Sequence, residues 1–198
     1  MTDLTVTAAG VQFQNPVLLA SGTAAFGRSL DGVVDLDALG GIVTKAVSLE
    51  PRGGNAAPRV AEFEGGMLNA VGLANPGVEA VKRDDLPWLA AHVKRARVIV
   101  NVVGSRTEDF AEVVRHLDEC EIISAFELNV SCPNVRAGGI EFCADSTSLA
   151  AVVSGARSAT RRPIFVKLSP VLPNIGDAAL TAAAAGADGI TVINTLPG

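Results

Sequence analysis

The chain has 198 residues, of which 48% are hydrophobic and 19% are charged, and its formal net charge is −5. This composition is typical of one folded domain and excludes an extensively disordered chain, so we expect a single domain over residues 1–198. The acidic balance, without a basic stripe, argues against nucleic acid as a partner.

Neither membrane insertion nor a disulfide framework is expected. No apolar run reaches the roughly 20 residues that span a membrane, and no charged leader precedes an apolar segment. The three cysteines, Cys120, Cys132 and Cys143, lack the spacing of metal ligands or of disulfide partners, and their odd number fits a reducing compartment. They are also too few for an ordinary four-cysteine iron–sulfur cluster. We therefore expect a soluble, cytoplasmic protein without a membrane partner or a metal site.

The N-terminal residues predict a short hairpin, because residues 4–7 and 11–13 alternate around Ala8-Ala9-Gly10. Six short apolar runs follow and predict buried strands at residues 17–20, 41–44, 98–102, 126–130, 164–168 and 189–193.

Helical periodicity fills the intervals between these runs. The expected helices carry Leu30, Val33, Val34 and Leu39; Phe110, Val113, Val114 and Leu117, with a capping box from Ser105 to Glu108; Leu149, Val152, Val153 and Ala156; and the alanine-rich residues 178–185, ended by Gly186. Alternation of helices with strands this apolar predicts a parallel sheet covered by helices.

The interval at residues 49–76 is long and breaks this rhythm. It contains Arg52-Gly53-Gly54-Asn55 and the apolar stretch from Met67 to Gly77. Loops of this length inside a compact domain are usually functional, and the glycines indicate sharp bends or close approach to a ligand. We interpret the segment as a lid; the alternative is an ordinary surface excursion.

The expected fold is α/β, namely a (β/α)8 TIM barrel of which about six of the eight strand–helix units are present. A complete barrel needs about 250 residues, and no helix follows the sixth run, so we expect the barrel to be incomplete at its C-terminus. An open doubly wound sheet is the competing architecture, but no glycine-rich turn follows the first strand.

Polar side chains lie at or after each expected strand, and the carboxyl ends of parallel barrel strands form one mouth where chemistry is built. They are Ser21, Lys45, Asn101, Asn129, Cys132, Lys167 and Asn194. Carboxamides with two ammonium groups suit a planar, anionic or hydrogen-bonding ligand such as a pyrimidine or a flavin. No carboxylate pair lies at these ends and no histidine lies near Cys132, which disfavours glycosidase and Cys–His chemistry.

Cys132 lies in the run Asn129-Val130-Ser131-Cys132-Pro133-Asn134, at the end of an expected strand. An unperturbed thiol has a pKa of about 8.5, so its thiolate can accept a proton near neutrality. The alternative is an inert buried thiol, which the neighbouring Ser131 and Pro133 disfavour by placing the residue in a loop.

Taken together, these segments closely resemble dihydroorotate dehydrogenases of the cytosolic class, and within it the NAD-linked form. The resemblance rests on residues 15–17 and 20–23, Thr44-Lys45, residues 51–54, Pro58-Arg59, residues 67–77, residues 129–134 with Gly138-Gly139, residues 166–170, and Ile193-Asn194-Thr195.

The resemblance implies a barrel that binds FMN and oxidises (S)-dihydroorotate to orotate in pyrimidine biosynthesis. It assigns Cys132 as the base that removes the C5 proton while a hydride passes from C6 to the flavin. The implied substrate-binding residues are Lys45, Asn69, Gly72, Leu73, Asn129, Asn134, Asn194 and Thr195. The implied cofactor-binding residues are Ala20, Ser21, Lys45, Asn101, Asn129, Lys167 and Ile193.

The resemblance also implies partners. The family pairs barrels into homodimers, and its NAD-linked form works with a second subunit that carries FAD and an iron–sulfur cluster. The family holds the FMN phosphate after strands seven and eight, which this sequence lacks. Three alternatives stay open: an aldolase-like barrel with Lys167 as a Schiff-base lysine, an FMN domain like that of dihydropyrimidine dehydrogenases, and a non-catalytic truncated barrel.

Overall fold

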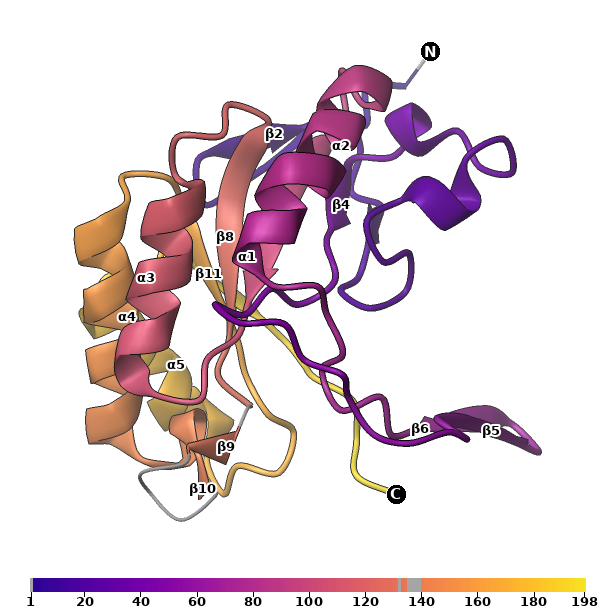
Figure 1. Ribbon diagram of the computed structural model, residues 1–198. Coiled ribbons are helices and arrows are strands. Elements are labelled where there is room, and N and C mark those ends of the chain that lie inside the picture. Colours follow the sequence, from indigo (N-terminus) through magenta and orange to yellow (C-terminus); the bar gives the residue numbers. More distant parts are fainter. Residues whose placement is uncertain (1, 132, 135–139) are drawn as a thin grey trace.

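A computed structural model describes residues 2–131, 133–134 and 140–198, and its centre is a curled, six-stranded parallel sheet with helices on its outer face (Figure 1). The strand order is β12-β11-β8-β7-β4-β3. The strands are β3 (Leu18–Leu19), β4 (Gly41–Val43), β7 (Arg97–Val102), β8 (Ile123–Asn129), β11 (Ile164–Lys167) and β12 (Gly189–Thr191). Each overlaps one of the six expected apolar runs, which confirms the α/β fold as part of a TIM barrel.

The outer face of the sheet and the helices share the main core. The helical elements are η1 (Arg28–Leu30), η2 (Leu36–Ala38), α1 (Val78–Ala80), the π-helical η3 (Val81–Asp85), α2 (Leu86–His92), α3 (Thr107–Leu117), η4 (Phe142–Ala144), α4 (Ser146–Ala159) and α5 (Ile175–Ala184). Strand residues of alternate parity, such as Val100, Phe126 and Val166, are fully buried against them. None of the helices in the described part of the chain has the length and apolar character to cross a bilayer.

A second, smaller core lies on the inner face of the sheet at the amino ends of the strands. The expected N-terminal hairpin is present as β1 (Val6–Ala8) and β2 (Val11–Phe13), paired antiparallel. Val11 and Phe13 pack against Val43, Ile99 and Ala125 of the sheet. The hairpin therefore covers this end of the curled sheet and leaves the carboxyl ends open.

The expected helix at Leu30 to Leu39 is wrong. The structure has only the short turns η1 and η2 there, and Gly32 between them has a φ of +74°, which a right-handed helix cannot contain. The side chain of Asp35 then accepts a hydrogen bond from the Asp37 N–H and starts the second turn. Val33 is 78% exposed, so its helical spacing does not reflect burial.

Helix α3 begins one residue later than the expected capping box. Its cap uses Asp109 rather than Glu108: one Asp109 carboxylate oxygen accepts the N–H groups of Ser105 and Arg106, each at 2.9 Å. Burial acts to raise the pKa of Asp109, but these N–H groups and the Arg106 guanidinium outweigh it and hold the pKa below its usual value.

We expect Asp109→Ala to lower the free energy of unfolding by about 1–2 kcal/mol near neutral pH, the cost of losing a helix cap. Because the folded pKa is depressed, this stabilisation is complete above the unfolded pKa of about 3.9 and is lost as the pH falls through the folded value. Urea denaturation at neutral and acidic pH checks both points, with Glu112→Ala in the same helix as the control. Equal losses at both pH values would contradict the cap assignment.

Phe110 anchors helix α3 in the core. Its ring is fully buried and lies edge-to-face against Phe142, with ring centroids 5.3 Å apart. We expect Phe110→Ala to lower the free energy of unfolding by about 3–5 kcal/mol, as other large cavities in cores do. In the same urea measurement, Phe63→Ala, whose side chain is 55% exposed, should change stability little.

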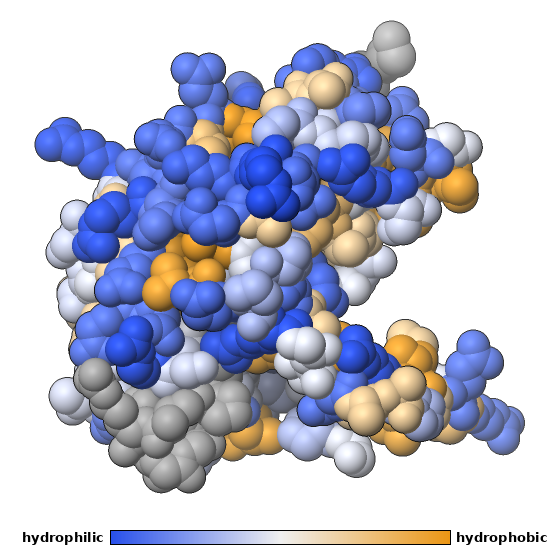
Figure 2. All heavy atoms as spheres, in the orientation of Figure 1, coloured by the Kyte–Doolittle hydropathy of each residue, from blue (hydrophilic) through white to orange (hydrophobic). Residues whose placement is uncertain are grey.

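The long interval at residues 49–76 forms a projecting arm rather than an irregular loop (Figure 1). Its strands β5 (Val60–Phe63) and β6 (Gly66–Asn69) pair antiparallel. Backbone hydrogen bonds between Arg52 and Asn75 close its base. Figure 2 shows apolar side chains gathered on this arm and a hollow between it and the body of the molecule.

Candidate functional site

A pocket of about 660 Å³ lies at the carboxyl ends of the strands, between the sheet and the arm. Loops after β3 and β4, the ends of β8 and β11, the segment after β12 and residues 67–73 all contribute to it. The lining residues are Ser21, Gly22, Thr23, Lys45, Ala46, Val60, Met67, Asn69, Ala70, Val71, Gly72, Leu73, Asn129, Lys167, Asn194 and Thr195.

This pocket brings together most of the site residues expected from the sequence. Those that line it are Ser21, Lys45, Asn69, Gly72, Leu73, Asn129, Lys167, Asn194 and Thr195. They come from segments up to 174 residues apart (Ser21 and Thr195), and the parallel topology places them at one edge of the sheet.

Five expected site residues are not among those that line this pocket. Ala20 and Ile193 flank it, and both are exposed. Asn101 is completely buried within the sheet. Asn134 belongs to the short strand β9 (Pro133–Asn134), which pairs with β10 (Ile140–Glu141), and only its backbone is described. Cys132 lies outside the described residues.

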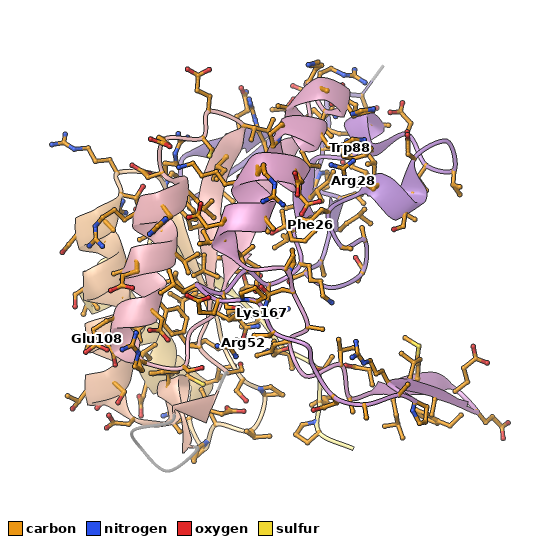
Figure 3. The ribbon with its side chains drawn as sticks, in the orientation of Figure 1. Phe26, Arg28, Arg52, Trp88, Glu108 and Lys167 are labelled. Carbon is orange, nitrogen blue, oxygen red and sulfur yellow. The ribbon has the colours of Figure 1, made fainter. Side chains whose placement is uncertain are left out.

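Lys167 is the most unusual group in the pocket (Figure 3). It ends β11, with Ile164 and Val166 turned into the helical core, so strand alternation turns Lys167 to the inner face. Its side chain is only 8% exposed, and its ammonium has no hydrogen bond or ion pair within the part of the chain that is described. The side chain is thus mostly covered by protein while its ammonium, which lines the pocket, keeps its donors available to a ligand.

The charge of the pocket is positive. Lys45 follows β4 and lines the same pocket as Lys167, and no acidic side chain is among its lining residues. Two ammonium groups without a neighbouring carboxylate favour an anionic ligand.

Amide groups supply hydrogen bonds beside these charges. The Asn194 side-chain NH₂ donates to Oδ1 of Asn129 at 3.1 Å, and Asn194 Oδ1 accepts the N–H of Thr195 at 2.9 Å. Asn129 is 6% exposed and pairs with Lys167 across the β8–β11 ladder. The amides of this edge therefore lie on the strands and segments next to Lys167.

The sequence did not single out one buried polar residue, Glu127. It lies in β8 two residues before Asn129, is 3% exposed and accepts hydrogen bonds from Asn101 and Thr191. A carboxylate inside the expected strand 126–130 was the available signal, of the same kind as the lysine inside the expected strand 164–168.

The two cysteines whose surroundings are described are poor proton acceptors. Burial raises the pKa of Cys143 to about 11 and also raises the pKa of Cys120. Both are therefore protonated near neutrality, which leaves Cys132 as the candidate base among the three cysteines of the chain. No cluster of three or more metal-ligating side chains occurs among the described residues.

Fold and pocket together define a class of protein: a β/α barrel with a cationic, amide-lined ligand site at the carboxyl ends of its strands. A family profile described as dihydroorotate dehydrogenase matches residues 3–197. The chain belongs to the dihydroorotate dehydrogenase family.

Similar proteins carry two different names within this family. The chain is 46% identical to the dihydroorotate dehydrogenase B (NAD(+)) catalytic subunit of Pelobacter propionicus, over 99% of this chain and 64% of that protein. It is 48% identical to the protein of the same name from Desulforudis audaxviator, over 96% of this chain and 62% of that protein. It is 44% identical to dihydroorotate dehydrogenase A (fumarate) of Lactiplantibacillus plantarum, over 100% of this chain and 65% of that protein. The chain therefore spans less than two thirds of the length of these relatives.

Proposed function

We propose that the protein containing this chain oxidises (S)-dihydroorotate to orotate with FMN, as a step of pyrimidine biosynthesis. The observation that carries the proposal is the largely buried Lys167, whose ammonium has no described partner, in a pocket lined by amides and a second lysine. These groups fit a planar ring with alternating N–H and C=O edges, and the pocket volume of about 660 Å³ is in the usual range for small-ligand sites. When bound, FMN would supply the hydride-accepting chemistry.

The lining residues divide between two ligands in this proposal. Ala20, Ser21, Lys45, Asn101, Asn129, Lys167 and Ile193 would surround the cofactor. Lys45, Asn69, Gly72, Leu73, Asn129, Asn134, Asn194 and Thr195 would hold the carboxylate and ring edges of the substrate. Lys45 and Asn129 serve both, and Cys132 would accept the proton from carbon. Residues 1–198 would belong to a single FMN-binding barrel domain, incomplete at its C-terminus.

Titration of the ligand-free protein with FMN tests this function. We expect the flavin fluorescence to change saturably, and added orotate to perturb the absorption of the bound flavin. A protein that takes up neither FMN nor orotate would support the non-catalytic reading. If dihydrouracil reduced the bound flavin and dihydroorotate did not, the dihydropyrimidine dehydrogenase-like alternative would be favoured.

We also propose the NAD-linked form, a homodimer of barrels with an FAD and iron–sulfur subunit, in the cytoplasm. Sequence identity does not distinguish the NAD-linked form from the fumarate-linked form. The chain is 46% identical to a relative named for NAD(+) and 44% identical to one named for fumarate. The Met67-Leu68-Asn69-Ala70 motif supports the NAD-linked form, and the three cysteines of residues 1–198 are too few to hold a four-cysteine iron–sulfur cluster by themselves. NAD reduction by the complete assembly, and no fumarate reduction by the isolated chain, is the expected result.

A further inference from the structure

The projecting arm, residues 49–76, joins the body of the molecule beside the pocket (Figure 1). Where the chain enters the arm, Val47 forms a parallel bridge with Val102 at the end of β7, so this leg of the arm extends the sheet. Where the chain leaves the arm, residues 69–73 line the pocket before the chain reaches helix α1. The position of these pocket residues over the sheet therefore depends on how the two legs are joined.

A buried amide, the side chain of Asn75, joins the two legs. Asn75 is 7% exposed, and Ser48 on the other leg is 2% exposed. Oδ1 of Asn75 accepts the N–H of Ser48 at 3.2 Å and the N–H of Gly77 at 3.0 Å. The NH₂ of Asn75 donates to Oγ of Ser48 at 2.8 Å and to the carbonyl of Leu73 at 2.8 Å. Both donors and both acceptor positions of this side chain are thus used.

These partners match an asparagine and no residue of similar size. Two backbone N–H groups need an acceptor, and the Leu73 carbonyl needs a donor. Aspartate has the same shape but offers no donor when ionised, and an aliphatic side chain offers neither group. The backbone hydrogen bonds between Arg52 and Asn75, at 2.9 and 3.0 Å, could be made by any residue other than proline and do not account for the amide.

One of these hydrogen bonds supports a strained residue of the pocket. Leu73 lines the pocket and has a φ of +56°, in the left-handed region that side chains with a Cβ rarely adopt. Such a conformation persists only where the surrounding structure imposes it. The hydrogen bond from the Asn75 NH₂ to the Leu73 carbonyl is part of that support, at the point where the chain turns from the pocket wall into the base of the arm.

We propose that Asn75 is a positioning residue of this site, which holds the pocket-lining residues 69–73 over the sheet by joining their leg of the arm to Ser48. Ser48 follows Lys45 by three residues, so the same contact fixes the arm relative to the leg that carries one ammonium of the pocket. Asn75 itself is not among the lining residues and acts through Leu73 and Ser48. The inference deepens the proposed function, on which it rests only for the identity of the ligand.

Hydrogen exchange of the ligand-free full chain, followed by mass spectrometry, tests whether Asn75 holds the arm. We expect Asn75→Ala to increase the exchange rate of peptides covering residues 60–74 by about tenfold, while peptides from β7 and β8 keep their native rates. Ser48→Ala removes only the hydroxyl and should raise the rate of the same peptides by about threefold, which provides a milder variant should Asn75→Ala fail to fold. Native exchange of the arm in both variants would overturn the proposal.

A matched control uses an asparagine at the other end of the sheet. The Asn15 side chain also joins two backbone segments, since its NH₂ donates to the Ala38 carbonyl at 2.9 Å and its Oδ1 accepts the Val17 N–H at 3.1 Å. These segments precede β4 and β3 at the amino ends of the strands, away from the arm. We expect Asn15→Ala to leave the exchange of the arm unchanged. Equal acceleration by Asn15→Ala and Asn75→Ala would assign the effect to a generally loosened fold and contradict the proposal.

Ligand affinities separate positioning from a purely structural role. Apparent affinity falls with the fraction of molecules that are competent to bind, so Asn75→Ala should weaken orotate binding to the FMN-loaded protein by about tenfold. The affinity for FMN should change by no more than about twofold, because residues 69–73 belong to the proposed substrate side of the pocket. Faster exchange of the arm with native orotate affinity would reveal a structural contact only and contradict the proposal.

The two proposals can fail separately. A native protein that binds neither FMN nor orotate would refute the proposed function and leave hydrogen exchange to decide whether Asn75 holds the arm. A native protein that binds both ligands, with unaltered exchange and orotate affinity in Asn75→Ala, would refute the role of Asn75 alone.

Discussion

Replacing Cys132 by alanine is expected to slow reduction of the bound flavin by dihydroorotate at least about a hundredfold. The reason is that a positioned general base typically contributes a factor of about 10²–10⁴ to a proton abstraction. Orotate is the product and needs no proton removed from it, so it should still bind with nearly native affinity. Anaerobic stopped-flow spectroscopy of the flavin measures the first quantity, and an orotate titration measures the second.

The other two cysteines provide the controls. Cys143 is buried with a pKa of about 11, and burial also raises the pKa of Cys120. Neither is a proton acceptor near neutrality, so Cys120→Ala and Cys143→Ala should reduce flavin at nearly the native rate. Native-like reduction in Cys132→Ala would remove that thiol from the mechanism.

Replacing Lys167 by methionine is expected to weaken FMN binding by roughly ten- to a hundredfold. A hydrogen bond to a charged group is worth about 1.5–3 kcal/mol, and each 1.4 kcal/mol is a tenfold change in affinity. Methionine retains much of the side-chain volume and removes the charge together with the hydrogen-bond donors of the ammonium. Fluorescence titration measures the dissociation constant, with Lys94→Met on the surface as the control. Native affinity in Lys167→Met would contradict a cofactor role for this lysine.

Stability of the same variant separates a binding role from a structural one. The native side chain is largely buried and its ammonium has no described partner, so methionine should leave the stability of the ligand-free protein unchanged or increase it. Urea denaturation without FMN checks this. A large loss of stability would indicate that Lys167 holds the fold together instead of awaiting a ligand.

The strands could be predicted from the sequence because parallel strands covered by helices are continuous apolar runs. The helix at Leu30 to Leu39 was wrong because apolar spacing alone ignores backbone conformation, and Gly32 adopts a positive φ there. The arm was taken for a loop, although Glu64 and Gly65 between its strands are a two-residue turn, with Gly65 at a φ of +87°. The apolar residues of the arm are exposed, so the sequence lacks the alternation of apolar and polar residues that marks a half-buried hairpin.

The site was predictable where it depends on strand ends. Lys45, Asn129, Lys167 and Asn194 converge because parallel topology places the carboxyl ends at one edge. The layer below was not predictable in this way. Whether Asn101 and Glu127 meet depends on the β7–β8 register, in which they are paired residues, and a single sequence does not reveal register. The hydrogen bond between Glu127 and Thr191 spans the intervening strand β11. No local sequence pattern predicts a contact between strands that are not neighbours.

The central claim is that this pocket serves the oxidation of dihydroorotate by a bound flavin. The most direct test is the visible spectrum of the purified FMN-loaded protein, recorded without oxygen before and after addition of dihydroorotate. The proposal predicts that the yellow absorption of oxidised flavin bleaches and that orotate appears in equal amount. A spectrum that dihydroorotate leaves unchanged, in a protein that has bound FMN, would contradict it.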